Sequence, residues 1–214
     1  TSAPDRRASI FRLLMIVKTY GGRFVIRRNS TTVHATCPAA RGPWQNAPVK
    51  QPAEGCVWVC IEIPRGSRNK YEIDHETGVV MLDRRLFTAT TYPADYGFVP
   101  DTLGGDGDPI DALVLLEDSV YPGVWVQARP IGVLYMQDEA GEDAKLICVP
   151  PQEPRWTNVN DISDLTPQLI QEIQHFFEVY KALEPNKYSS TTGMGGREQA
   201  WREITDARAN HRPA

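Results

Sequence analysis

Between Cys56 and Val149 the chain consists of short stretches with strand character, separated by turns rich in glycine and proline. A period of two places successive side chains on opposite faces of a strand. In the first stretch this leaves Glu62 as the only charged group among apolar side chains. Short strands at close spacing predict a small closed barrel. The predicted strands are residues 56–63, 70–74, 79–84, 111–116, 124–135 and 144–149.

The periodicity changes after residue 165. Thr166 is a good helix N-cap and Pro167 suits the first turn, and apolar residues then recur at helical spacing as far as Pro185. A second helix is predicted at about Arg197 to Ala209. The predicted class is therefore α+β, mainly β, with a barrel and two or three flanking helices.

Residues 1–54 differ in composition from the rest. They carry nine Lys or Arg against two acidic residues, a balance of 9 − 2 = +7, and they are rich in Ser, Thr and Pro. Such Arg-rich, acid-poor segments resemble organellar presequences. The alternatives are an upstream segment translated from a wrong start and a functional extension. We expect a poorly ordered, non-catalytic leader at 1–54 and the catalytic domain at 55–214. A chain that starts near Glu54 is expected to fold and work.

The remaining residues are strongly acidic. They hold 23 − 9 = 14 basic and 27 − 2 = 25 acidic residues, a balance of −11. This charge argues against non-specific binding of nucleic acid. It allows an anionic substrate only where metal ions or focused cations reverse the local field.

The cysteines show no metal-ligand spacing. Cys56, Cys60 and Cys148 lie in apolar stretches and Cys37 in the leader, so buried free thiols and a reducing compartment are expected. No apolar run approaches the 18 residues that a spanning helix needs. We therefore predict a cytoplasmic protein without a membrane partner, with organellar targeting by the leader as the alternative.

Three carboxylates lie close together between residues 106 and 111. Gly107 and Pro109 separate Asp106, Asp108 and Asp111, so the segment is predicted to be a turn. Carboxylates held this close repel one another unless a cation lies among them. Hard oxygen ligands on a tight loop suit Mg²⁺ or Mn²⁺ better than Zn²⁺.

Two other interpretations of this turn are a solvated acidic turn and an EF-hand. The EF-hand pattern fails, because Ile110 occupies its fifth position and Asp111 stands where glycine is required. The metal interpretation therefore depends on other polar groups that reach the same place. Asp138 and Asp143 flank a predicted hairpin turn with Lys145 beyond it, and Lys70 and Glu72 share a strand face.

Several motifs in the same order resemble the soluble family I inorganic pyrophosphatases, over roughly residues 56–188. They are Glu62-Ile-Pro, Lys70-Tyr-Glu72, Leu-Asp-Arg84, Tyr92-Pro-Ala-Asp-Tyr96-Gly, Asp106-Gly-Asp108-Pro-Ile-Asp111, Asp138-Glu-Ala-Gly-Glu-Asp143-Ala-Lys145 and Tyr180-Lys181-Ala-Leu-Glu. The resemblance implies a five-stranded OB-like barrel with helices. It also implies hydrolysis of inorganic pyrophosphate to two phosphates, by a metal-activated water attacking in line. Bacterial members form hexamers, so a homo-oligomer is expected.

The resemblance also implies a role for each matching residue. Asp108 would accept the proton of the attacking water, and Tyr92 would support the wall of the site. Metal ligands would be Asp106, Asp111, Asp143, Asp138, Glu62 and Glu72, of which the first three hold the tightest ion. Phosphate contacts would come from Lys70, Arg84, Tyr96, Lys145, Tyr180 and Lys181, with Lys70, Arg84 and Tyr96 also counted as catalytic.

The charges of this set agree with the resemblance. Seven carboxylates face four cations, a formal 4 − 7 = −3, while pyrophosphate is itself a polyanion. Divalent ions must therefore belong to the working site, with Mg²⁺ expected and Mn²⁺ or Zn²⁺ as substitutes. Two ions about 3.5–4 Å apart would lower the pKa of a shared water. Arg84 suits phosphate with its planar fork, and the lysines act as point charges.

The sequence departs from the family at two places. Thr90-Thr91 replaces a Met-containing pair, and Ser189–Gly196 replaces a Val-Lys-rich strand, which puts the closing segment of the barrel in question. Two rival functions also remain open at this point. One is an OB module that binds nucleic acid, and the other is a metal phosphohydrolase that acts on nucleotides.

Overall fold

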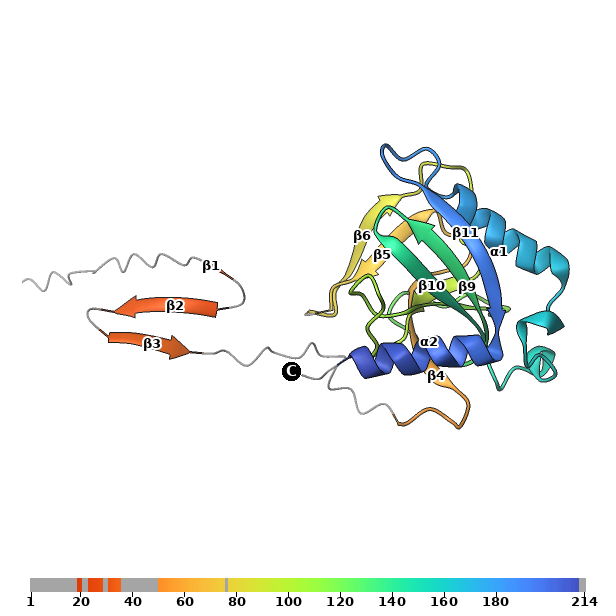
Figure 1. Ribbon diagram of the computed structural model, residues 1–214, viewed down its shortest axis with the longest axis horizontal. Coiled ribbons are helices and arrows are strands. Elements are labelled where there is room, and N and C mark those ends of the chain that lie inside the picture. Colours follow the sequence, from red (N-terminus) through yellow and green to blue (C-terminus); the bar gives the residue numbers. More distant parts are fainter. Residues whose placement is uncertain (1–18, 21–22, 29–30, 36–49, 76, 212–214) are drawn as a thin grey trace, which may run out of the picture. The chain divides into compact units, whose positions relative to one another are not determined.

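The computed structural model describes residues 19–20, 23–28, 31–35, 50–75 and 77–211 (Figure 1). The chain divides into two compact units, Thr1–Asn46 and Ala47–Ala214. In the first unit, antiparallel pairing joins β1 (Thr19–Tyr20), β2 (Arg23–Arg28) and β3 (Thr31–Ala35). The expectation of a poorly ordered leader at 1–54 concerns residues that lie largely outside those described.

The second unit is mainly β. Its strands are β4 (Val57–Ile63), β5 (Asn69–Ile73), β6 (Val80–Arg85), β7 (Asp95–Phe98), β8 (Asp111–Val114), β9 (Trp125–Asp138), β10 (Gly141–Val149) and β11 (Ser189–Gly196). The helices are α1 (Pro167–Val179) and α2 (Arg197–Asn210), with single 3₁₀ turns η1 (Pro154–Trp156) and η2 (Ile162–Asp164).

Five strands close into a ring, which confirms the predicted barrel. β4 pairs with β7, β7 with β8, β8 with β10, β10 with β9, and β9 again with β4. Only the β8–β10 pair is parallel. β9 has 14 residues, so it pairs with β4 near its beginning and with β10 and β11 further along. The strands β5 and β6 form a separate two-stranded sheet.

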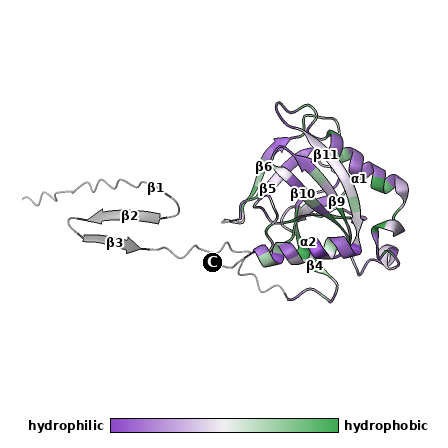
Figure 2. Ribbon diagram, in the orientation of Figure 1, coloured by the Kyte–Doolittle hydropathy of each residue, from purple (hydrophilic) through white to green (hydrophobic). Residues whose placement is uncertain are grey.

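The two helices cover different parts of the barrel core. Ile173, Phe176 and Phe177 of α1 pack with Ile63, Leu113 and Leu134 in one apolar cluster. Ala200, Ile204 and Ala207 of α2 pack with Val59, Ala112 and Leu146 in another. Figure 2 shows hydrophobic and hydrophilic stretches alternating along α2, as expected for a helix that buries one face.

Several predicted boundaries need correction. The helix predicted to reach Pro185 ends at Val179, and the residues after it form turns whose side chains make ion pairs. The hairpin turn between β9 and β10 is only two residues long, because Gly141 adopts a φ of 129° that suits glycine. Asp138 and Asp143, which were predicted to flank a turn at 139–142, therefore lie within the strands β9 and β10.

The atypical segment Ser189–Gly196 does form a strand. It pairs antiparallel with β9 despite its Ser, Thr and Gly content, and a register shift falls between Thr191 and Gly193. In Figure 1, β11 runs alongside α1 and ends where α2 begins. The segment thus extends the sheet beside β9, while the barrel closes without it through the β9–β4 pair.

The three described cysteines, Cys56, Cys60 and Cys148, are buried free thiols, as predicted. Burial raises the pKa of the Cys60 thiol to about 12. Over the part of the chain that the structure describes, no helix is both long enough and apolar enough to cross a membrane.

Candidate active site

One cavity of about 620 Å³ collects all of the residues predicted to hold metal, bind phosphate or take part in catalysis. Its lining includes carboxylates from β4, β5, the turn before β8, and the β9–β10 hairpin, and cations from β5, β6, β10 and the segment after α1. The predicted residues that line it are Glu62, Lys70, Glu72, Arg84, Tyr96, Asp106, Asp108, Asp111, Asp138, Asp143, Lys145, Tyr180 and Lys181.

The Asp106–Asp108 segment is a turn at the edge of this cavity. Gly107 adopts a φ of 95°, and the backbone N–H of Asp108 donates to Asp106 Oδ1 at 3.1 Å. Asp106 and Asp108 are exposed, whereas Asp111 begins β8 and is partly buried. The turn thus presents two solvated carboxylates beside a third that is fixed by the barrel.

Lys145 occupies the centre of the site. Its Nζ lies 2.6 Å from Asp111 Oδ2, 2.7 Å from Asp143 Oδ2 and 3.0 Å from the Tyr96 hydroxyl. Burial by itself lowers the pKa of Lys145, but the two carboxylates outweigh it and hold the pKa above its ordinary value. Tyr96 in turn donates a hydrogen bond to Asp111.

Strand register explains why these groups meet. Asp143 is the cross-strand partner of Met136 and Lys145 of Leu134, so Asp138, two residues beyond Met136, shares their face of the hairpin. Lys145 is also the partner of Asp111 on β8. One face at the open end of the barrel therefore carries the whole cluster.

Glu62 is the most perturbed carboxyl group of the site. Burial raises its pKa to about 7, although the Ile73 N–H donates to its Oε1 at 2.8 Å and opposes the rise. A cation that enters the cavity would stabilise the charged form of Glu62, which burial disfavours.

The β5–β6 hairpin carries a second group of charges. Lys70 pairs with Glu72, and its Nζ lies 3.3 Å from Asp83 Oδ2, which also accepts a hydrogen bond from Arg84. Burial by itself raises the pKa of Asp83, but Lys70 and Arg84 outweigh it and hold the pKa below its ordinary range. Asp83 thus links the two cations of the hairpin.

On the opposite wall, Lys181 pairs with the β9–β10 hairpin. Its Nζ lies 2.7 Å from Asp138 Oδ2 and 3.1 Å from Glu139 Oε1. Tyr92 does not line the cavity; its buried ring packs behind it, with centroids 5.4 Å from Tyr96 and 4.8 Å from Phe176.

Sequence reasoning missed several lining residues. Asp83 and Glu139 are direct neighbours of predicted residues in the sequence, and Asp74 shares the strand face of Lys70 and Glu72. These positions could have identified the three carboxylates as part of the site. Nothing in the sequence pattern pointed to two other side chains of the wall, His75 and Lys187. All five line the same cavity.

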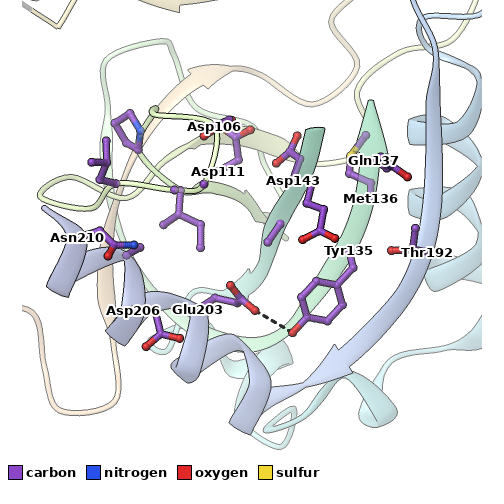
Figure 3. Close-up of a pocket in the computed structure, with 18 residues that line it drawn as sticks. Asp106, Asp111, Tyr135, Met136, Gln137, Asp143, Thr192, Glu203, Asp206 and Asn210 are labelled. Atoms are coloured by element: carbon purple, nitrogen blue, oxygen red, sulfur yellow. Dashed lines mark hydrogen bonds between the residues drawn. The ribbon is translucent and has the colours of Figure 1, made fainter. Parts of the chain in front are cut away.

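A second cavity of about 410 Å³ lies behind the Asp106–Asp111 segment (Figure 3). It shares Asp106, Asp111 and Asp143 with the first cavity, so the turn and β10 form a common wall. The side facing them comes from α2 and β9, where the Tyr135 hydroxyl donates to Glu203 at 3.1 Å.

The carboxylates of the cavity offer only oxygen atoms as metal ligands, and oxygen ligands suit a hard divalent ion. Among the residues described, no three His, Cys, Asp or Glu side chains are already grouped closely enough to hold an ion, so the side chains of Asp106, Asp111 and Asp143 would have to move together for a metal to bind. The ammonium group of Lys145 supplies the positive charge between Asp111 and Asp143 instead.

Comparison with known proteins identifies the family. The family model described as "Inorganic pyrophosphatase" matches residues 59–212, which is most of the second unit. The chain belongs to the inorganic pyrophosphatase family. The resemblance of the motifs is thereby confirmed.

Inorganic pyrophosphatases of bacteria resemble this chain over nearly their whole length. The protein of Leifsonia xyli is 56% identical over 152 residues, which cover 71% of this chain and 93% of that protein. The protein of Streptomyces coelicolor is 57% identical over 146 residues, 68% of this chain and 90% of that protein.

Solved structures of inorganic pyrophosphatases have the same fold. That of Thermus thermophilus is 47% identical, with a TM-score of 0.74, and the match covers 77% of this chain and 95% of that one. That of Helicobacter pylori is 45% identical, with a TM-score of 0.74, over 78% and 98% of the two chains. The predicted OB-like barrel with helices is therefore confirmed.

Proposed function

We propose that this protein hydrolyses inorganic pyrophosphate to two phosphates. What carries the proposal is that a chain of this family gathers its carboxylates, four lysines and one arginine around one cavity. The rival OB module would need a basic groove with exposed aromatic side chains, and this cavity has interleaved acids instead.

The family implies a divalent metal cofactor, and we propose Mg²⁺, with Mn²⁺ or Zn²⁺ as substitutes. Asp106, Asp111 and Asp143 would hold the tightest ion, and Glu62, Glu72 and Asp138 would help hold the ions that arrive with substrate. Bound there, the ions would supply positive charge to the substrate and would acidify the attacking water.

The chain's own cations would orient the two phosphates. Arg84 offers a planar fork to phosphate oxygens, and Lys70, Lys145 and Lys181 act as point charges. Tyr96 and Tyr180 offer hydroxyl donors at the cavity wall. Positioning and charge stabilisation of this kind provide most of the catalysis in phosphoryl transfer.

Asp108 is the proposed general base. It is exposed on its turn, and Lys145 pairs with Asp111 and Asp143, so the Asp108 carboxylate lies outside the Lys145 cluster. It would accept the proton of the attacking water as the water attacks in line with the leaving phosphate.

A phosphate-release panel tests this function. Pyrophosphate, tripolyphosphate and ATP are supplied with Mg²⁺ or Mn²⁺, and release from pyrophosphate alone is expected to be fast. Asp108→Asn should abolish turnover without unfolding the chain, while Glu172→Asn on the exposed face of α1 should not change it. Comparable release from ATP would favour a nucleotide hydrolase, and substantial activity of Asp108→Asn would refute its role.

We further propose that residues 55–214 are the catalytic domain and that residues 1–54 are dispensable. The compact second unit, which begins at Ala47, supports this boundary. A chain that starts at Glu54 is expected to match the full chain in the phosphate-release assay. Loss of folding or activity on this truncation would assign the leader a function.

A homo-oligomer, a hexamer by family resemblance, is also proposed. Support comes from apolar side chains exposed on and beside β6, where Val79, Leu82 and Phe87 are 54%, 60% and 55% exposed. Light scattering measures the mass directly, and a monomer would refute the proposal. A cytoplasmic location is proposed from the free thiols, which fit a reducing compartment.

A further inference from the structure

The turn after α1 contacts both sides of the active-site cavity. Lys181 reaches the β9–β10 hairpin through Asp138. Three residues later, Glu184 reaches the other side, where its Oε1 accepts a hydrogen bond from Arg84 Nε at 3.0 Å. The two residues of this second pair are 100 positions apart in the sequence.

Glu184 is a buried carboxylate that does not line the cavity. Its side chain is 4% exposed and that of Arg84 is 20% exposed. A charged pair at this distance and burial is stronger than a surface ion pair, because little solvent screens it. The only other cation near Glu184 in the described chain is Lys187, at 3.8 Å.

The contacts of Arg84 fix the plane of its guanidinium group. Nε donates to Glu184 and Nη1 to Asp83. Nη2 makes no hydrogen bond within the described residues, and Arg84 lines the cavity. Because the guanidinium is planar, contacts at two of its nitrogens determine where its remaining donors point.

Of these two contacts, only Glu184 connects Arg84 to the body of the protein. Asp83 is the neighbour of Arg84 on β6, and it pairs with Lys70 of the same hairpin, so it moves with Arg84. The β5–β6 sheet has no strand pairing with the barrel. The hairpin is joined to β4 through the Ile73–Glu62 hydrogen bond, and Glu184 is the side chain that ties the Arg84 guanidinium to the segment after α1.

We propose that Glu184 is a positioning residue for pyrophosphate hydrolysis, which holds Arg84 ready for a phosphate oxygen of the substrate. The inference rests on the proposed function, since Arg84 must bind substrate for its orientation to affect turnover. An arginine that is oriented before substrate arrives loses less conformational entropy on binding.

The test is a double-mutant cycle on the full chain, with Glu184→Gln, Arg84→Ala and the double variant. With pyrophosphate and Mg²⁺, Glu184→Gln should lower kcat/KM about 10-fold, mostly through KM, because uniform binding is weakened. In the Arg84→Ala background the same change should alter kcat/KM less than about 2-fold. Glu172→Gln removes one exposed charge from α1 and serves as the matched control.

Two further measurements separate positioning from a general structural effect. The Mg²⁺ concentration for half-maximal activity should not change in Glu184→Gln, because the residue does not face the metal ligands. Thermal unfolding should show a folded variant. If Glu184→Gln does not fold, Glu184→Asp replaces it. Its side chain keeps the negative charge but is one methylene shorter, and it should lower kcat/KM in the same way.

The outcomes are distinguishable. Unchanged kcat/KM in Glu184→Gln, or an equal loss in both backgrounds, would overturn the inference while wild-type activity upholds the proposed function. Absence of phosphate release from the wild-type chain would overturn the function and the inference together.

Discussion

Lys145 should be one of the most important single residues for the stability of the metal-free protein. Its side chain is 3% exposed, and its ammonium group lies between the side chains of Asp111 and Asp143, which are 27% and 16% exposed. Lys145→Met keeps the side chain's length and removes the charge. Two partly buried carboxylates then face each other without a cation.

The expected cost follows from these contacts. Removing one partner of a buried ion pair destabilises a protein by about 3–5 kcal/mol. For a domain of this size, about 2–4 °C of melting temperature corresponds to 1 kcal/mol, so a loss of about 4 kcal/mol lowers the midpoint by about 8–16 °C. Lys50→Met, at an exposed position, is the control and should change the midpoint by less than about 2 °C.

Thermal unfolding at pH 8 in the presence of a chelator measures this cost. Repeating the melt with Mg²⁺ should return a larger share of the lost stability to Lys145→Met than it adds to the wild-type chain, because the bare carboxylates attract the ion more strongly. A chelator-treated variant that melts within about 2 °C of wild type would refute the reasoning.

Two structural predictions follow from contacts outside the cavity. Asp161 accepts a hydrogen bond from the Arg197 N–H at 2.8 Å and so caps α2, whose own N-cap, Gly196, offers no side chain; Asp161→Ala should cost about 1 kcal/mol in a denaturant melt. The Arg197 N–H lowers the pKa of Asp161. The stabilisation from this cap is therefore present above the unfolded pKa of about 3.9 and is lost as the pH falls through the lower folded pKa. An equal cost of Asp161→Ala at about pH 2.5 and about pH 7 would contradict this assignment. Gly97→Ala would place Cβ 1.9 Å from the Cys60 carbonyl oxygen and force β7 away from β4, at a cost of about 3 kcal/mol or more, and a chain of wild-type stability would disprove the clash.

Short apolar stretches between turns rich in glycine and proline predicted most of the barrel, although its strands are largely buried on both faces. The strand β7, Asp95–Phe98, was missed since it is short, contains Gly97 and lies fully buried, so it has no alternation to detect. The helix α1 was predicted too long because Tyr180 and Leu183 continue its apolar spacing, although the chain leaves the helix at Tyr180.

The candidate site was predicted through motifs, and the contacts between its parts were not. Sequence spacing says nothing of a pair such as Arg84 and Glu184, which only the closed fold brings together. The central place of Lys145 likewise depends on the register between β8 and β10. Local patterns can identify the charged residues of a site, whereas their partners depend on long-range packing.

The separate β5–β6 sheet divides the site into halves that differ in local stability. The aspartates of β8 and β10 belong to strands with neighbours on both sides, so their amide hydrogens exchange only when the ring opens. The hairpin with Lys70 and Arg84 has ladder bonds to itself alone, so its amides should exchange with deuterium much sooner. The proposed metal ligands Asp111, Asp138 and Asp143 would thus lie in the slowly exchanging half, whereas Lys70 and Arg84, proposed to contact phosphate, would lie in the half that opens readily.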